Sequence, residues 1–455
     1  MEIFDLLVLG GGPGGYLCAE RAAQGGMRVC LFEKKALGGT CLNEGCIPTK
    51  TLLNSAKMYR HATQSQAYGV TVQGVTYDHE KVIQRKNKVV SALVSGVGST
   101  MSANKVTVIS ANAVIKGREA EGFAVEADGI TYIGRRLAIA TGSETVIPPV
   151  PGLKEGISSG FVLTNREVLN ELTLPKKLVA IGGGVIGLEM AYYFASVGVE
   201  VTVIEMMPKI AGATDPEICK VLTDDCVKRG MTFKLSCKVL EIKENSVVYE
   251  EDGQRKEISC DKVLLSAGRR PATAGIGLEN LNLEMDRAAI VVDRNLCTTV
   301  SGVYAIGDCN GKMMLAHTAY REAEVAVNHM LGKRDEMRYD VIPSVIYTDP
   351  EIASVGLSAE AAQGRGMQVK EVKLPMSYAG RYLAETDGGK GFIKLVVDTD
   401  KKRLVGCHLV GAYASEIIMT ATMMIDTELT PERLQKLVFP HPTVAEIIRE
   451  AIFHI

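Results

Sequence analysis

Two cysteines, Cys41 and Cys46, lie five residues apart in the stretch at residues 38–50, which reads GGTCLNEGCIPTK. A thiol pair this close in sequence can cycle between a dithiol and a disulfide, which is a two-electron step. A flavin bound beside the pair would accept those electrons. The alternative is that two of the eleven cysteines lie near each other by chance and are inert in a core.

A second group with reactive potential lies close to the C-terminus, where His441 is followed five residues later by Glu446. An imidazole titrates near neutral pH, and a carboxylate on its other nitrogen fixes the tautomer and raises the basicity of the ring. The two residues can therefore act as base and orienting acid. A histidine near a C-terminus, taken alone, is more often an ordinary surface or core residue.

A nucleotide-binding unit precedes the cysteine pair. Residues 6–9 are an apolar run that predicts a strand, the turn Gly10-Gly11-Gly12-Pro13-Gly14-Gly15 follows, and residues 16–24 suit a helix. A second strand is predicted over residues 27–32, and Glu33 comes directly after it. In this order the glycines allow a pyrophosphate to approach the helix N-terminus, and the acid binds a ribose hydroxyl.

The same pattern recurs 172 residues later. Residues 178–181 predict a strand, the turn is Gly182-Gly183-Gly184-Val185-Ile186-Gly187, and Glu205 follows the strand at residues 200–204. One such fingerprint is weak evidence of a site, but two in register predict two bound dinucleotides.

The position of the cysteine pair in the sequence indicates which unit binds which cofactor. Because residues 38–50 leave the first unit directly, the first unit should hold FAD and the second a nicotinamide cofactor. Glu205 favours NAD, since a carboxylate accepts a hydrogen bond from a 2′-hydroxyl and repels a 2′-phosphate. Met206 and Met207 stand where an NADP enzyme would use arginines, and Lys209 is a small counter-signal.

With 455 residues, the chain is about three times as long as a typical domain. Residues 148–152 are a proline-rich hinge, and after residue 342 strands are predicted at 345–347 and 392–397 and helices at 414–426 and 431–438. We expect an α/β fold with two Rossmann-like dinucleotide-binding domains and a C-terminal α+β interface domain. The predicted boundaries are 1–147 (FAD domain), 148–270 (NAD domain), 271–340 (return to the FAD or central domain) and 341–455 (interface, or dimerisation, domain).

Composition excludes several other classes of protein. The net charge is −2 and no Lys/Arg-rich run is present, so no nucleic-acid partner is expected. No run approaches about eighteen uninterrupted apolar residues, so no membrane span is predicted. Residues 1–5 lead into a strand without the features of a secretion signal, and scattered cysteines suit a reducing compartment. A cytoplasmic location without a metal site is therefore expected.

Three motifs give the chain a resemblance to a known family. Residues 38–50 resemble the redox-active disulfide loop of the flavoprotein disulfide reductases, whose pattern is G-G-T-C-x-N-x-G-C-x-P-x-K. Residues 441–446 match the family pattern H-P-T-x-x-E, and residues 342–357 resemble the opening of the family's interface domain. Over nearly its whole length the chain is similar to the dihydrolipoamide dehydrogenase family, a class I group of pyridine nucleotide-disulfide oxidoreductases.

The resemblance implies a homodimer in which His441, oriented by Glu446, is the acid/base in the active site of the other subunit. It implies that dihydrolipoamide attacks Cys41, and that Cys46 passes electrons to FAD, which reduces NAD⁺ to NADH. Lys50 corresponds to a lysine near flavin N5, and Glu189 corresponds to its ion-pair partner. The implied partners are lipoyl-bearing proteins of a 2-oxoacid dehydrogenase or glycine cleavage complex.

The resemblance also implies the residues that contact each cofactor, among them His317 as a positional residue rather than a base. For FAD they are Gly10, Gly12, Gly14, Gly15, Glu33, Thr40, Lys50, Ala113, Thr141, Gly142, Ser143, Asp308, Met314, Leu315, Ala316 and His317. For NAD they are Gly182, Gly184, Val185, Ile186, Gly187, Glu189, Glu205, Val239 and Gly268.

Several related functions fit the residues less well. Glutathione reductases usually have a tyrosine at the position of Val185, mercuric reductases carry a C-terminal cysteine pair, and soluble transhydrogenases lack the redox cysteines. Another NADH-linked disulfide reductase of the family, or a mainly docking subunit of a lipoyl complex, are the alternatives. Glu44 departs from the family pattern, and its charge is expected to raise the pKa values of the cysteines or lower their reduction potential slightly.

Overall fold

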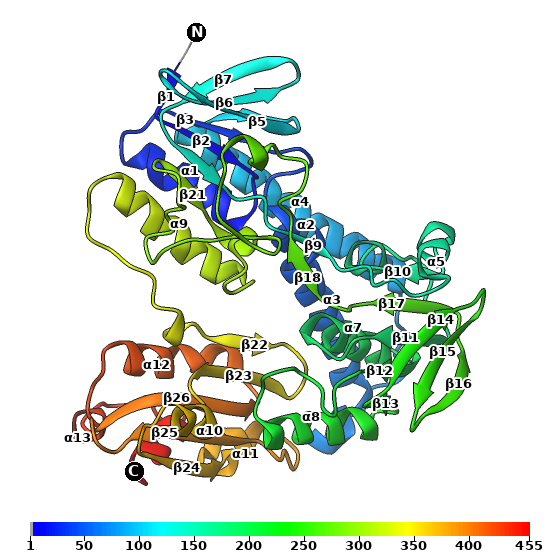
Figure 1. Ribbon diagram of the computed structural model, residues 1–455. Coiled ribbons are helices and arrows are strands. Elements are labelled where there is room, and N and C mark those ends of the chain that lie inside the picture. The colour runs from blue at the N-terminus through cyan, green and yellow to red at the C-terminus, as the bar shows by residue number, and fades with distance from the viewer. Residues whose placement is uncertain (1–2) are drawn as a thin grey trace.

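The first glycine turn belongs to a five-stranded parallel sheet in the computed structural model, which describes residues 3–455 (Figure 1). The strands, in spatial order, are β21 (Val303–Ala305), β8 (Leu137–Ile139), β2 (Leu6–Leu9), β3 (Val29–Phe32) and β4 (Thr107–Ile109). β3 begins two residues later than predicted. α1 (Pro13–Gln24) begins three residues earlier than predicted, because the fixed φ of Pro13 suits the start of a helix.

The second glycine turn belongs to an equivalent parallel sheet. Its strands, in spatial order, are β10 (Val162–Leu163), β17 (Lys262–Leu265), β11 (Lys177–Ile181), β12 (Glu200–Ile204) and β13 (Thr232–Lys234). α7 (Val185–Ser196) follows β11, and α8 (Pro216–Lys228) follows β12. The two sheets with their helices are the pair of Rossmann-like units that the repeated fingerprint predicts.

Further strands, most of them antiparallel, complete both units. The first unit adds β1 (Ile3–Phe4), β5 (Ala113–Glu119), β6 (Gly122–Ala127), β7 (Ile130–Gly134), β19 (Met285–Asp286) and β20 (Ala289–Ile290), and the second adds β14 (Lys238–Ile242), β15 (Ser246–Glu251) and β16 (Gln254–Ser259). β9 (Ser143–Thr145) pairs antiparallel with β18 (Arg269–Pro271), so the chain leaves the first unit and returns to it along adjacent strands.

The cysteine pair lies on helices of the first unit. Cys41 belongs to α2 (Gly39–Glu44), and Cys46 is the first residue of α3 (Cys46–Thr63). The remaining helices of the first two units are α4 (His79–Ala103), α5 (Leu153–Ser159), α6 (Asn165–Val168) and α9 (Ala316–Met330). α4 begins where the Asp78 side chain accepts a hydrogen bond from the Lys81 backbone N–H, an ordinary N-cap.

The C-terminal domain is an antiparallel sheet covered by helices, and it lies at the bottom of Figure 1. The sheet contains β22 (Ser344–Ile346), β23 (Glu351–Gly356), β26 (Arg403–Gly411), β25 (Phe392–Asp398) and β24 (Val369–Pro375), and the helices are α10 (Ala359–Gly364), α11 (Gly380–Glu385), α12 (Ala414–Asp426), α13 (Pro431–Leu434) and α14 (Glu446–Ile452). α12 has the predicted bounds. The helix predicted over 431–438 ends at Leu434, and the backbone N–H groups of Lys436 and Leu437 then donate to carbonyl groups three residues earlier, as in turns.

A buried cluster joins all three domains. Leu52 of α3, Tyr193 of α7 and Ile352 of β23 belong to it, and each is almost fully buried. The helix that carries Cys46 is therefore fixed against both other domains. Within residues 3–455, no helix is both long enough and apolar enough to cross a membrane, and no cluster of side chains suited to a metal ion occurs.

Candidate active site

A cavity of about 1140 Å³ brings most of the predicted site residues together. It is lined from the first unit by Gly10, Gly12, Gly14, Glu33, Thr40, Cys41, Cys46, Lys50, Ala113, Thr141, Gly142, Ser143, Asp308, Met314, Leu315, Ala316 and His317. From the second unit it is lined by Gly184, Val185, Ile186, Glu189 and Gly268. The other predicted residues, Gly15, Gly182, Gly187, Glu205, Val239, His441 and Glu446, do not line it. One cavity thus extends from the first glycine turn, past the cysteines, to the second turn.

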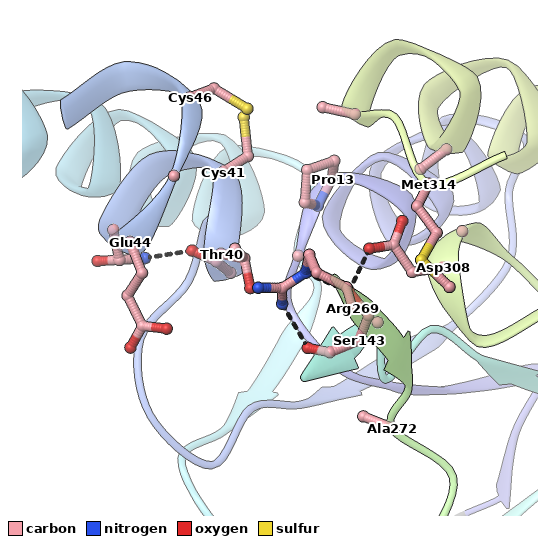
Figure 2. A pocket seen from close by; sticks show the side chains of 18 of the residues that line it. Pro13, Thr40, Cys41, Glu44, Cys46, Ser143, Arg269, Ala272, Asp308 and Met314 are labelled. Atoms are coloured by element: carbon pink, nitrogen blue, oxygen red, sulfur yellow. Dashed lines mark hydrogen bonds between the residues drawn. The ribbon is translucent and has the colours of Figure 1, made fainter. Parts of the chain in front are cut away.

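The two cysteine sulfur atoms point toward one another at the wall of this cavity (Figure 2). The hydrogen bond with Cys41 lowers the pKa of the Cys46 thiol to about 7, and the Lys50 charge supports this against the effect of burial. The same hydrogen bond and burial raise the pKa of Cys41. Cys46 also begins α3, and the positive end of a helix dipole favours a thiolate there. Of the two sulfur atoms, Cys46 is therefore the one that carries negative charge near neutral pH.

An ion pair between a partly exposed lysine and a buried carboxylate lies one helical turn beyond Cys46. Lys50 Nζ is 2.7 Å from Glu189 Oε2, although the two residues are 139 positions apart. Glu189 is 3% exposed, and its second oxygen accepts a hydrogen bond from the Tyr347 backbone N–H at 3.0 Å. The carboxylate is thus fully engaged, and the ammonium group is held at the cavity wall.

The two glycine turns have the same close contacts. Gly10 and Gly182 have φ angles of +101° and +105°, which favour glycine. A Cβ on Gly15 would lie 1.8 Å from the Gly10 carbonyl oxygen, and a Cβ on Gly187 would lie 2.2 Å from that of Gly182. Gly15 and Gly187 therefore serve the packing of helix on strand, which explains why they do not line the cavity.

The two acids that end the fingerprints also have equivalent partners. Glu33 accepts hydrogen bonds from the backbone N–H groups of Gly11 at 2.8 Å and Lys35 at 2.7 Å. Glu205 accepts them from Gly183 at 2.6 Å and Met207 at 2.8 Å. Each carboxylate oxygen retains a free lone pair, so both acids can still accept a hydroxyl hydrogen bond.

A charged network closes the cavity wall where the first unit meets β18. The Arg269 guanidinium donates from Nε to Ser143 Oγ at 2.7 Å, and Ser143 Oγ donates to Asp308 Oδ2 at 2.5 Å (Figure 2). Burial lowers the pKa of Arg269 and raises that of Asp308. Arg269 belongs to β18, and no sequence motif singled it out.

The cavity has the features that a dinucleotide requires. The Thr141 hydroxyl lies in its wall and is buried without a hydrogen-bond partner among the described residues. α1 has no side-chain cap, so its first backbone N–H groups point toward the cavity beside Gly12. An unpaired donor and an open helix N-terminus fit the hydroxyl and pyrophosphate groups of FAD.

His441 and Glu446 meet each other but not the cysteines. His441 Nδ1 donates to Glu446 Oε1 at 3.0 Å, and the Thr443 N–H donates to Oε2 at 2.9 Å. These bonds, the Thr443 N–H first, lower the pKa of Glu446. The His441 side chain is 78% exposed, so a neutral ring presents Nε2 to solvent as an acceptor. The pair therefore has the geometry of an oriented base, and it lies outside the cavity of its own chain.

Glu44 carries a charge that is already paired. Its carboxylate lies 2.5 Å from Arg166 Nε and 3.5 Å from Lys35 Nζ, and Figure 2 shows it pointing away from the two sulfur atoms. Arg166 and Lys35 thus balance the negative charge of Glu44. An effect of Glu44 on the thiols is not among the causes that set either thiol pKa.

Tyr347 is a cavity residue that the sequence did not single out. Its ring lies 4.4 Å from Lys50 Nζ, measured to the ring centroid. It follows β22 in the segment that resembles the opening of the interface domain. That motif predicts the domain, but it does not indicate that the Tyr347 side chain reaches the cavity. His317 also lines the cavity, and its Nε2 donates to the Pro343 carbonyl at 2.7 Å.

Comparisons with known proteins agree with this architecture. The family model described as pyridine nucleotide-disulphide oxidoreductase matches residues 4–323, and that family's dimerisation domain matches residues 342–452. A dihydrolipoyl dehydrogenase from Bacillus subtilis is 37% identical over 468 residues, which cover 98% of this chain and 97% of that one. One from Mycoplasma pneumoniae is 34% identical over 451 residues, with coverage of 98% and 97%.

The likeness extends to a solved structure. The HOCl-induced flavoprotein disulfide reductase RclA from Escherichia coli superposes with a TM-score of 0.86 at 28% identity, and the match covers 99% of each chain. Two glycine turns, a thiol pair between them and a C-terminal dimerisation domain thus occur in one chain whose whole length matches these proteins. This chain belongs to the pyridine nucleotide-disulphide oxidoreductase family.

Proposed function

We propose that this oxidoreductase is a dihydrolipoyl dehydrogenase, which oxidises protein-bound dihydrolipoamide to lipoamide and reduces NAD⁺ to NADH. The observation that carries the proposal is the shared cavity: Cys41, Cys46 and the Lys50–Glu189 pair lie between the two nucleotide turns. Dihydrolipoyl dehydrogenases of two bacteria are 34% and 37% identical to this chain over 98% of its length, which supports lipoamide as the disulfide product.

FAD is the proposed resident cofactor of the first unit, held by the open end of α1, Glu33, Thr141 and Asp308. When bound, it accepts an electron pair from the dithiol and delivers it to NAD⁺ as a hydride. Gly184, Glu189 and Gly268 line the part of the cavity proposed for NAD. Glu205 would select NAD over NADP by repelling a 2′-phosphate.

The thiol steps follow from the two sulfur atoms. The partner subunit's His441 takes a proton from a dihydrolipoyl thiol, and the resulting thiolate attacks Cys41 Sγ. The Cys41–Cys46 bond breaks, and its electron pair goes to Cys46 Sγ, where the low pKa stabilises the thiolate. The second lipoyl thiol then displaces Cys41 Sγ from the mixed disulfide and closes the lipoyl ring; its proton passes to Cys41 Sγ, which leaves a Cys41 thiol and a Cys46 thiolate.

The proposed assembly is a homodimer that serves lipoyl-bearing proteins of a 2-oxoacid dehydrogenase or glycine cleavage complex in the cytoplasm. The dimerisation domain and the exposed His441 support the dimer. Because this enzyme meets only the lipoyl arm, the proposal names the class of partner rather than one complex.

The first experiment is anaerobic mixing of the purified protein with dihydrolipoamide and NAD⁺, with NADH absorbance as the readout. We expect prompt NADH formation, at least about tenfold faster than with NADP⁺ or with glutathione as donor. The matched control is Cys46→Ser, which should still bind nucleotide but form no NADH. If NADH reduces the bound flavin but dihydrolipoamide gives no turnover, the lipoyl substrate is wrong and only the nucleotide assignments stand.

The likeness to RclA supports a second candidate, a disulfide reductase that runs from NADH toward a different disulfide. An assay of lipoamide reduction by NADH with the purified protein distinguishes the two candidates. The reaction should proceed if the protein is a dihydrolipoyl dehydrogenase. Failure with lipoamide, together with reduction of another low-molecular-weight disulfide, would favour the second.

A further inference from the structure

Tyr347 contacts both members of the Lys50–Glu189 ion pair. Its ring centroid lies 4.4 Å from Lys50 Nζ, and its backbone N–H donates to Glu189 Oε1 at 3.0 Å. The other Glu189 oxygen is the one that binds Lys50, at 2.7 Å. The three residues therefore form a closed cluster in which one residue holds the cation through its ring and the anion through its backbone.

The cluster joins three segments that are far apart in sequence. Lys50 belongs to α3, Glu189 to α7, and Tyr347 follows directly after β22 of the dimerisation domain. All three line the large cavity. A residue of the dimerisation domain thus reaches the place where the thiols face both nucleotide turns.

Lysine needs such contacts to act as a fixed charge. Its ammonium group sits on a flexible stem with four carbons, so a single carboxylate leaves it free to swing about one contact. An aromatic face attracts a cation by its quadrupole and does not neutralise it as a second carboxylate would. The ring therefore restricts Lys50 and leaves its positive charge available to the cavity.

We propose that Tyr347 is a positioning residue, whose ring holds the Lys50 ammonium where it stabilises negative charge on Cys46 and on the group that receives its electrons. The inference rests on the proposed function, which gives Lys50 this electrostatic role. Displacement of Lys50 should change the pKa of Cys46, which can be measured without substrate, because the Lys50 charge is one of the influences that lower the pKa of that thiol.

The test uses the purified holoenzyme, reduced with dithiothreitol and freed of reductant under anaerobic conditions. Cys46 is titrated by site-resolved alkylation with iodoacetamide and by the long-wavelength absorbance of the thiolate beside the flavin. In Tyr347→Leu we expect the Cys46 pKa to rise and alkylation near pH 7 to slow by about threefold. Tyr347→Phe keeps the ring and should behave as the wild type. Tyr347→Met replaces the leucine variant if that one does not fold.

A matched control comes from a second lysine–aromatic contact. Lys373 Nζ lies 4.5 Å from the ring centroid of Phe392 in the same domain, but neither residue lines the cavity. Phe392→Leu should therefore leave the Cys46 titration unchanged. A wild-type titration in Tyr347→Leu, or an equal shift in Tyr347→Leu and Phe392→Leu, would overturn the proposal.

Lys50→Met completes a double-mutant cycle. If the ring acts through Lys50, Tyr347→Leu causes no further shift once Lys50 is removed. Additive shifts would overturn the inference. Because these titrations need neither lipoyl substrate nor NAD⁺, a failure of dihydrolipoamide turnover would remove the proposed substrate and leave the result for Tyr347 standing.

Discussion

Cys41 and Cys46 have identical side chains, yet their surroundings separate their chemistry. Cys46 starts a helix, accepts the hydrogen bond of its neighbour and lies one turn from Lys50, and its thiol pKa falls to about 7. Cys41 donates that hydrogen bond from a partly buried place, so its pKa is raised. A proton that leaves the dithiol therefore leaves Cys46, and Cys41 stays available for exchange with an external sulfur atom.

This asymmetry predicts the effect of removing the donor. In Cys41→Ala the largest influence that lowers the Cys46 pKa disappears, so the pKa should rise from about 7 toward or above the ordinary thiol range. The thiolate fraction at pH 7 then falls, and iodoacetamide should alkylate Cys46 about tenfold more slowly, with recovery as the pH is raised.

Cys297 provides the internal reference for that measurement. It is partly exposed, but burial raises its pKa to about 11, and it is not part of the cavity. The alkylation rate of Cys297 should be slow and equal in the wild type and in Cys41→Ala. Unchanged reactivity of Cys46 in Cys41→Ala would show that the neighbouring thiol does not set its charge.

At the scale of elements, the last glycine of each turn packs against the carbonyl group of the first glycine in both strand–turn–helix units. A Cβ on Gly187 would lie 2.2 Å from the Gly182 carbonyl oxygen and 2.4 Å from Ser266 Oγ. Both neighbours are fixed, since Ser266 Oγ itself donates to the carbonyl oxygen atoms of Ile181 and Gly182. The helix must therefore move away from the strand if any side chain is added.

We expect Gly187→Ala to destabilise the second unit by about 1–3 kcal/mol through this overpacking and to abolish NADH binding. Retention of FAD would localise the damage to the second unit. Gly184→Ala is the matched control in the same turn, because a Cβ there meets nothing within 4 Å. Gly184→Ala should keep the wild-type melting temperature, measured calorimetrically. Because Gly184 lines the cavity, any loss of NADH affinity in this variant comes from the added methyl group and not from unfolding. Equal melting temperatures for both variants would contradict the packing argument.

Elements next to a fingerprint were predictable from sequence, and so was α12, but several elements without a motif were not. The strands and helices at residues 6–33 and 178–205 follow from local patterns of glycine, apolar residues and acid. The sheet of β14, β15 and β16 and the long helix α4 carry no such motif. The end of α13 was missed because helical periodicity continues past Leu434, although the backbone there changes from a helix to turns.

For the molecule as a whole, the site depends on contacts that no local pattern encodes. Lys50, Glu189 and Tyr347 meet from three domains, and Arg269 reaches Ser143 over 126 positions. The resemblance to a family identified Lys50 and Glu189, but Tyr347 and Arg269 became visible only when the domains were packed together. Long-range packing therefore accounts for the part of the site that the sequence left open.

One predicted group stays outside the cavity. The His441–Glu446 pair has its geometry in place, yet His441 is exposed and lines no wall near Cys41. A thiol that reaches Cys41 needs a base close by, and residues 342–452 match a dimerisation domain. A two-fold dimer places the same surface of each subunit against the other, so one subunit can supply the base to its partner.

This arrangement predicts complementation between two inactive variants. Cys41→Ala lacks the proposed interchange thiol, and His441→Gln lacks the proposed base, so each homodimer should be inactive with dihydrolipoamide. In a heterodimer isolated through two different affinity tags, one site combines both defects and the other combines both intact groups. We expect about half of the wild-type activity per dimer. If base and thiol acted within one chain, every site of the heterodimer would carry one defect, and the activity would stay at the background of the two homodimers.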